Sequence, residues 1–196
     1  MTAATQAEDT DDAEARPGYG EGREALLRAA VKVVACGGLR KLTYRAVAAE
    51  AGVTHGLVAH HFGSRDTLLE QALGWCVRRS IETSSLVPAS GRLEDFAATL
   101  ADVIATDPDL QAFQYELKLE SRRRPELRRH LDTLYDAYRA AVREALACFA
   151  VSEDMAEIVF AALEGLVFHQ TTSGDPRPTE QGIEALRRLL AAHRAQ

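Results

Sequence analysis

Residues that start and stop helices crowd into one short stretch of this sequence, between positions 37 and 64. Thr43, Thr54 and Ser64 each offer a hydroxyl that can cap the first turn of a helix. Gly52 lies at a corner where a tight connection between helices needs a positive φ. This spacing leaves room for two helices of about eight residues each, and it predicts a compact helical unit rather than strands.

Apolar residues recur at helical spacing along the rest of the chain. Hydrophobic residues make up 46% of the 196 residues and aromatic residues only 6%, while Ala, Leu, Arg and Glu are abundant. This composition favours helices over sheets. We therefore expect an all-α protein, with a three-helix N-terminal head and a larger C-terminal helical part. The expected helices cover residues 21–36, 44–50, 54–61, 64–83, 92–106, 107–122, 126–150, 152–173 and 179–193.

Charge is distributed unevenly, although the formal net charge of the chain is −6. Residues 1–20 carry five acidic residues and one arginine, and their composition predicts a disordered acidic arm. Residues 21–80 carry nine Lys and Arg against five acidic residues. A locally basic segment on an acidic chain suits a protein that meets nucleic acid through one region only.

Several other classes of protein find no support in the sequence. The three cysteines are widely spaced in apolar contexts, so we expect buried, reduced thiols rather than disulfides. His55, His60 and His61 do not share one helical face, so we expect no metal site, and we expect no cofactor. The chain has no Gly-rich phosphate loop and no Ser/His/Asp pattern, which argues against an enzyme. Because neither a signal peptide nor an apolar run of about 20 residues is present, we expect a cytoplasmic protein without membrane contact.

The helix that follows the Gly52 corner has the features of a DNA-reading helix. An α-helix fits the major groove, where base edges present a readable pattern of donors and acceptors. Thr54, His55 and Gly56 at its start are polar or small, so we expect them to face outward. We expect the apolar residues Val53, Val58 and Phe62 to face inward. The pattern therefore predicts a helix-turn-helix.

Residues 42–69, LTYRAVAAEAGVTHGLVAHHFGSRDTLL, also resemble the helix-turn-helix of the TetR (tetracycline repressor) family. They follow its pattern L-T-x-R-x-V-A-x-x-A-G-V-[ST]-x-G-x-[LV]-x-x-H-F-x-[SN]-[KR]-x-x-L-L almost throughout. The resemblance covers about residues 21–75 and implies a DNA-binding head, a ligand-binding body and a dimer built mainly from the last two helices. Ala59 replaces a tyrosine that binds phosphate in many members, and this small residue is similar to the BetI-like branch.

The resemblance implies three parts and a set of DNA contacts. The parts are the acidic arm (1–20), the helix-turn-helix domain (21–66) and a ligand-binding and dimerisation domain (67–196). The implied groove or backbone contacts are Arg45, Thr54, His55 and Gly56. The implied phosphate contacts are Thr43, Tyr44, His60 and Arg65.

The remaining site residues come from the pattern of the C-terminal part. A ligand pocket between helices would be lined by some of its large or polar side chains, with Trp75, Phe96, Phe113, Tyr115, Tyr135, Tyr138 and His169 as candidates. The last two helices carry wide apolar faces, which predicts a symmetric four-helix dimer interface. The predicted interface residues are Ile158, Ala161, Ala162, Gly165, Leu166, Ile183, Leu186 and Leu190. The basic run Arg122–Arg124 lies among glutamates, so we expect a salt-bridged junction rather than a second nucleic-acid site.

These features together predict a ligand-responsive repressor that binds a pseudo-palindromic double-stranded operator as a homodimer. An unknown small-molecule effector would displace the helix of residues 64–83 and so change the spacing of the two heads. Two alternatives stay open at this point. One is an activator or a co-repressor-dependent regulator of the same fold, and the other is a helical module that binds a protein partner rather than DNA.

Overall fold

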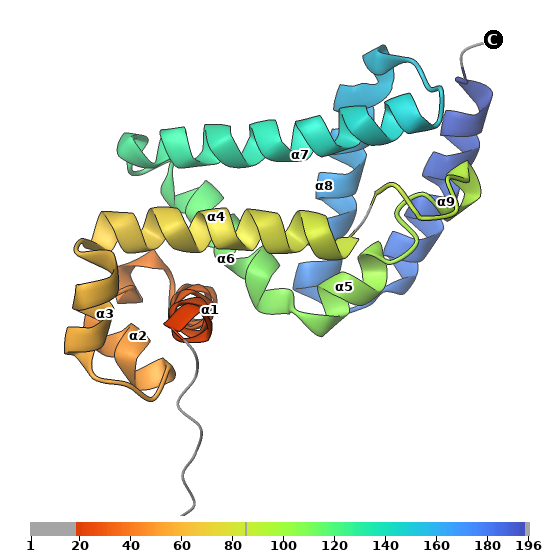
Figure 1. The fold of residues 1–196 in the computed structure, drawn as a ribbon. Coiled ribbons are helices and arrows are strands. Elements are labelled where there is room, and N and C mark those ends of the chain that lie inside the picture. Colours follow the sequence, from red (N-terminus) through yellow and green to blue (C-terminus); the bar gives the residue numbers. More distant parts are fainter. Residues whose placement is uncertain (1–18, 85, 195–196) are drawn as a thin grey trace, which may run out of the picture.

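The computed structural model describes residues 19–84 and 86–194, and helices dominate both ranges (Figure 1). The described residues form no β-sheet, only an isolated bridge between Val151 and Arg194. The all-α prediction is therefore confirmed. Residues 1–18 of the predicted acidic arm lie outside the described residues, while Tyr19 already begins a helix. The α-helices are α1 (Tyr19–Gly37), α2 (Tyr44–Glu50), α3 (His55–Phe62), α4 (Arg65–Ser84), α5 (Leu100–Thr106), α6 (Pro108–Glu120), α7 (Arg128–Cys148), α8 (Ala156–Ser173) and α9 (Arg177–Ala192), with single 3-10 turns η1 (Leu39–Lys41), η2 (Leu93–Asp95), η3 (Pro125–Leu127) and η4 (Glu153–Met155).

Side-chain caps begin two of the helices near the N-terminus, as the sequence predicts. The Ala46 amide donates to Thr43 Oγ1 at 3.1 Å at the start of α2. The Thr67 amide donates to Ser64 Oγ at 3.0 Å at the start of α4. Thr54 precedes α3 but makes no such bond. The predicted caps at Thr43 and Ser64 are confirmed, and the hydroxyl of Thr54 stays available for another partner.

The molecule is elongated, with the head at one end and the last two helices at the other (Figure 1). Helices α1 to α3 form the head, which we define as residues 19–62. Helices α4 and α7 run side by side from the head towards α8 and α9, and they are in contact. Helix α4 therefore connects the two ends of the molecule directly.

Two hydrophobic clusters hold the helices together. The first contains Val34, Leu68 and Phe113 and joins the head to α4, α6 and α7. The second contains Phe149 and Ile183 and joins η2 and α5 to α7, α8 and α9. Because the first cluster crosses from the head into the body, movement of α6 or α7 against the head must disturb a packed core. The functional division near residue 66 stays a prediction.

Two alanines have a left-handed backbone conformation, and one of them, Ala97, lies inside a helix that the sequence predicts as continuous. Ala97 and Ala150 both have a φ of 54°. The helix predicted over 92–106 is therefore wrong in its first half, where η2 and a turn precede α5. The helix predicted from Ser152 begins instead with η4, and α8 starts at Ala156. A left-handed alanine costs about 1–2 kcal/mol, so tertiary packing must impose it, and the sequence gives no sign of it.

The environment of the cysteines corrects one prediction and the basic junction confirms another. Cys76 is buried as expected, but Cys36 and Cys148 are exposed because they lie on the outer faces of α1 and α7. At the junction after α6, the buried Glu120 pairs with Arg123 at 3.1 Å and with Arg124 at 3.0 Å. These ion pairs account for part of the basic run, as a salt-bridged junction requires.

Candidate functional site

The corner between α2 and α3 presents α3 at the end of the molecule. Gly52 has a φ of +68°, which a residue with a Cβ rarely adopts, and the Val53 amide then donates to Ala48 O at 2.9 Å. Val58 and Phe62 anchor α3 in the core, with exposures of 0% and 3%. The predicted inward position of Val53 is wrong, since it is 37% exposed. Two anchors on one side of an eight-residue helix leave its other side free.

The free side of α3 carries most of the residues that the sequence assigns to groove contacts. Thr54, His55, Gly56 and His60 are all exposed. A Cβ placed on Gly56 would meet nothing within 4 Å, so packing inside the protomer does not explain a glycine there. Leu57 is 40% exposed in the middle of this side, and sequence reasoning missed it because apolar residues are usually assigned to a core. An exposed leucine suits contact with the methyl group of a thymine.

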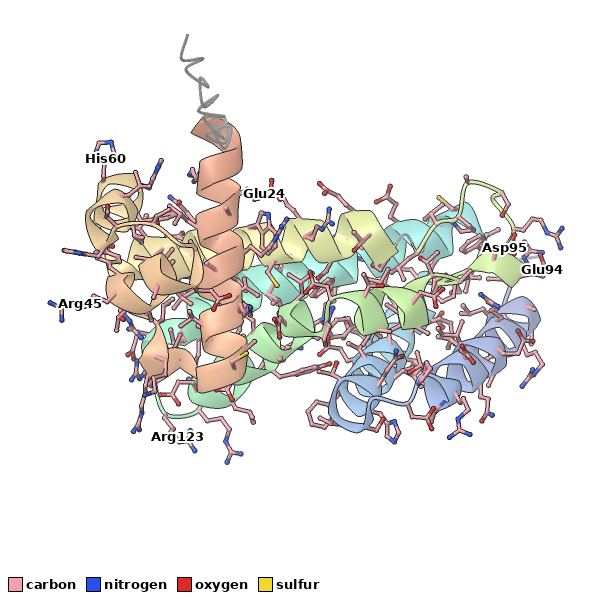
Figure 2. The ribbon with its side chains drawn as sticks, turned by 90° about the horizontal axis from the view of Figure 1, so that it is seen from below. Glu24, Arg45, His60, Glu94, Asp95 and Arg123 are labelled. Carbon is pink, nitrogen blue, oxygen red and sulfur yellow. The ribbon has the colours of Figure 1, made fainter. Side chains whose placement is uncertain are left out.

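Basic side chains extend this surface beyond α3. Arg45 is exposed on α2 and projects away from the body at the same end of the molecule as His60 (Figure 2). Arg40 and Lys41 are exposed in η1, just before α2. Thr43 is also exposed, although its hydroxyl already accepts the cap hydrogen bond. The exposed side of α3 and these neighbours form what we call the head face.

Two predicted phosphate contacts have other environments in the structure. The hydroxyl of Tyr44 is buried without a hydrogen-bond partner, because its ring packs against the first core cluster. The guanidinium of Arg65 donates to Leu42 O at 2.8 Å and to Leu39 O at 2.7 Å. Neither side chain points freely outward, and Arg65 instead fastens the start of α4 to the loop that leads into α2.

A cavity of about 220 Å³ lies in the body at the far end of α4. It is smaller than most sites for drug-sized ligands, which enclose about 300–1,000 Å³, but its lining is mostly apolar, as the lining of such sites usually is. Sequence reasoning missed most of the lining because it consists of aliphatic side chains that look like ordinary core. The lining residues are Ser80, Ile81, Ser84, Leu86, Val87, Leu100, Val103, Gln111, Tyr138, Ala141, Val142, Glu144, Phe160, Leu163, Glu164 and Val167.

Of the seven predicted pocket residues, only Tyr138 lines this cavity. Trp75, Phe96 and Phe113 are buried in the helix packing of the two core clusters. The other three lie away from the lining in contacts of their own: the Tyr115 ring packs on Phe168, the Tyr135 ring packs on Phe160, and the exposed His169 lies 3.5 Å from Ser173 Oγ. These six residues therefore do not line this cavity, because aromatic size predicts burial but not which space a ring fills.

A polar network forms part of the cavity wall. Tyr138 Oη donates to Gln114 Oε1 at 3.1 Å, and Gln114 Nε2 lies 3.4 Å from both Ser80 Oγ and Cys76 Sγ. Burial raises the pKa of Tyr138 above its usual range, and burial raises the pKa of Cys76 to about 12. Both groups therefore stay neutral, and Tyr138 connects the cavity to the middle of α4 and α6.

A partly buried ion pair joins the cavity wall to α6. Lys118 on α6 pairs with Glu164 on α8, and their side chains are only 13% and 27% exposed. Lys118 Nζ lies 4.7 Å from the ring centre of Tyr115 and 5.2 Å from that of Tyr135. Burial, then the charge of Glu164, raises the pKa of each tyrosine. The arrangement is a carboxylate with two aromatic rings around a cation.

The predicted dimer residues separate into two groups. Ile158 is 55% exposed, Ala161 and Gly165 are exposed, and Ala162 and Leu166 are half-buried. Phe168 and Leu189, which the sequence analysis did not assign to the interface, are 49% and 40% exposed. The other three predicted residues are corrections, because α8 and the η2–α5 region cover them inside the protomer: Ile183, Leu186 and Leu190.

Metal ligands do not converge anywhere in residues 19–84 and 86–194, where no three His, Cys, Asp or Glu side chains come together. In the same part of the chain, no helix combines the length and the apolar character that crossing a membrane requires.

The geometry assembled so far defines a class of protein. A short helix, anchored on one side and free on the other, follows a tight glycine corner and lies in a basic surface, and a cavity opens in a separate helical body. This is the arrangement of a helix-turn-helix transcriptional regulator.

Comparison with known proteins gives the family. Residues 26–72 match the family described as "Bacterial regulatory proteins, tetR family", and residues 91–192 match "Tetracyclin repressor-like, C-terminal domain". The chain therefore belongs to the TetR family of transcriptional regulators. It is 28% identical over 162 residues to the HTH-type transcriptional regulator BetI of Agrobacterium fabrum, covering 79% of each chain.

Solved structures of similar chains agree with this assignment. A member of the TetR family from Streptomyces coelicolor A3 is 30% identical, with a TM-score of 0.68 over 87% of this chain and 98% of that one. The multidrug binding protein EbrR, complexed with malachite green, is 28% identical, with a TM-score of 0.62 over 86% of this chain and 97% of that one. The predicted family and its similarity to BetI are confirmed.

Proposed function

We propose that this TetR-family regulator is a repressor that binds a pseudo-palindromic operator as a homodimer and releases it when a small molecule enters the body cavity. One observation carries the proposal: α4 connects the head to the cavity. Its first residue, Arg65, is bonded to the loop before α2, and Ser80, Ile81 and Ser84 near its other end line the cavity.

The head face supports DNA as the partner. It offers exposed hydroxyl, imidazole and guanidinium groups on and beside α3, and these groups suit base edges and phosphates. Gly56 allows close approach of the groove. Arg45 has no ion pair within the described part of the chain, so its charge is free to meet a phosphate.

The exposed side of α8 and α9 supports a homodimer. Ile158, Phe168 and Leu189 place large apolar surface in water in the single chain, and Ala161 and Gly165 allow close helix approach. A two-fold axis at this end of the molecule would hold two head faces for successive half-sites, which is the reason for a pseudo-palindromic operator.

The cavity supports a small-molecule effector. EbrR, a structural relative, binds malachite green and proflavin, as its structures are described. A ligand that favours one position of α4 shifts the population of head spacings, and only one spacing fits both half-sites. We propose release by ligand because α4 would have to move to admit a large molecule beside Ile81 and Ser84.

The first test measures binding of the purified protein to the intergenic DNA beside its own gene, at several salt concentrations. We expect tight binding that weakens steeply with salt, and loss of binding in Arg45→Ala and His55→Ala. Arg143→Ala is the matched control, because Arg143 is exposed on α7 far along the chain from the head. No binding at low salt by a folded protein would contradict the proposal.

The dimer has a separate test by sedimentation equilibrium. Ile158→Arg should convert the dimer to folded monomers, because it places a charge in the proposed interface. Leu57→Arg is the matched control, since Leu57 is 40% exposed on α3, in the head at the other end of the molecule from α8 and α9. If the Ile158→Arg protein stays dimeric, the dimer interface does not lie on this face of α8.

A further inference from the structure

We infer that the cavity takes an organic cation with a bulky apolar body, whose positive charge competes with Lys118 for the carboxylate of Glu164. This inference rests on the proposed function, since it names the class of effector for the same cavity.

The charges on the cavity wall have one sign. Glu144 and Glu164 are the only ionised side chains among the lining residues of the described chain, and no Lys, Arg or His contributes to the lining. Glu144 is exposed and has no ion pair among the described residues. An anion entering this cavity would meet two carboxylates, whereas a cation would meet its counter-charge.

The nearest basic groups are already occupied. Lys118 lies behind the wall, against Glu164 and the two tyrosine rings. Arg139 pairs with Glu157 at 2.9 Å, and its guanidinium stacks near the rings of Tyr135 and Phe160. Lys118 is not free to neutralise an anionic ligand without leaving the partly buried Glu164 unpaired, and Arg139, whose partner Glu157 is 64% exposed, lies outside the lining.

The surroundings of Lys118 show that this corner of the protein already holds a cation. A carboxylate and aromatic ring faces around an ammonium group are the usual features of sites that bind organic cations. Glu164 is shared, because it lines the cavity and also pairs with Lys118.

The rest of the lining defines the body of the ligand. Leu86, Leu100, Val142 and Leu163 are aliphatic, and Phe160 offers a ring. These side chains supply no directional hydrogen bonds, so affinity from this part of the wall comes from buried apolar area. A small hydrated ion would gain little here, and a bulky apolar cation gains both charge and area.

Competition for Glu164 connects ligand binding in the cavity to the packing of the head. The Lys118–Glu164 pair joins α6 to α8, and α6 packs along α1. A ligand cation that draws Glu164 towards the cavity weakens this link on the side of α6 that faces away from the head. Entry of a cation therefore loosens the helix against which the head rests.

The test uses two probes of nearly equal size and apolar surface but opposite charge, tetraphenylphosphonium and tetraphenylborate, titrated by calorimetry into the full-length protein. We expect the cation to bind the wild type at least about ten times more tightly than the anion. Glu164→Gln should weaken cation binding by about tenfold and narrow the difference between the probes. Glu180→Gln, which removes an exposed carboxylate on α9 outside the cavity wall, should leave both affinities unchanged.

Lys118→Met should change the affinity for the cation in the opposite direction from Glu164→Gln. Removing the competing ammonium should strengthen binding of tetraphenylphosphonium several-fold, which a merely structural role for Lys118 would not do. Equal or tighter binding of the anion to the wild type, an unchanged affinity in Glu164→Gln, or weaker cation binding in Lys118→Met would each overturn the inference.

A parallel titration of operator DNA separates this inference from the proposed function. If the wild type binds the operator but prefers the anion in its cavity, the inference about the ligand is refuted and the proposed repressor function is not. If the wild type prefers the cation but binds no operator, the proposed function fails and the charge preference of the cavity stands.

Discussion

Arg65 offers the sharpest test of how the head is held, because sequence and structure assign it different roles. As a phosphate contact, its guanidinium would face DNA. In the structure it donates to the carbonyl oxygens of Leu39 and Leu42, at 2.7 and 2.8 Å, from a half-buried position. We predict that Arg65→Ala lowers the stability of the folded protein and leaves the salt dependence of DNA binding unchanged.

The size of the effect follows from the two hydrogen bonds. A bond that involves a charged group contributes about 1.5–3 kcal/mol, and solvent at this half-buried site reduces that value, so the pair contributes about 2–4 kcal/mol. For a chain of this length, each kcal/mol corresponds to about 2–4 °C in Tm. We therefore expect Tm to fall by about 5–15 °C in differential scanning calorimetry. Arg65→Lys, which reaches one carbonyl at most, should lose about half as much.

The salt dependence of operator binding distinguishes the two roles. Loss of one phosphate contact per protomer would lower the slope of log K against log salt by about 0.9 per contact, or about 1.8 for a dimer. Arg45→Ala should show this change with an unaltered Tm, because Arg45 is exposed and makes no ion pair among the described residues. An Arg65→Ala protein with wild-type Tm and the reduced slope would refute our assignment.

Three further predictions concern a DNA contact, pH and packing. His60→Ala should weaken operator binding several-fold, because the His60 side chain is exposed on the head face, and an affinity equal to that of the wild type would contradict a DNA contact at this position. Burial, reinforced by Arg129, lowers the pKa of His130, so the unfolded chain takes up the proton first; Tm should fall as pH drops from about 6.5 towards the lowered pKa, and His130→Gln should flatten this fall. A Cβ on Gly182 would press on the side chain of Leu166, so Gly182→Ala should raise the free energy of unfolding by less than Gly22→Ala, which has open space around it and should gain about 1 kcal/mol of helix propensity; urea denaturation of both variants measures the difference.

The head could be predicted in detail because its determinants are local. The caps at Thr43 and Ser64 and the positive φ of Gly52 each depend on residues within a few positions, and all three occur where the sequence indicates. Val53 is the exception: apolar character alone does not say whether a side chain packs inward or is kept outside for a partner.

The cavity and the dimer face could not be predicted residue by residue because they depend on which neighbour covers an apolar stripe. Helical spacing places Ile183 and Leu186 on one face of α9 but does not show that the protomer itself covers that face. Likewise, Ala97 ends a helix by tertiary packing, without a glycine or proline to mark the position. Which apolar face is covered, and where such a helix ends, can be seen only when all the helices are placed together.

The energetics of release constrain how the ligand must act. Shifting operator-competent heads from about 99% to about 1% needs a differential affinity of about 10⁴, so each of two cavities in a dimer must contribute about 100-fold. A charge contact with Glu164 alone would supply about tenfold at its partial exposure. The remainder must come from apolar contacts with side chains such as Leu100 and Leu163, made only after α4 has moved. The first core cluster joins α4 and α6 to the head. Movement of α4 must therefore repack this cluster in a discrete step, because a close-packed core does not deform continuously. A ligand with the right charge but no apolar body should therefore bind the cavity only weakly and leave the operator complex intact.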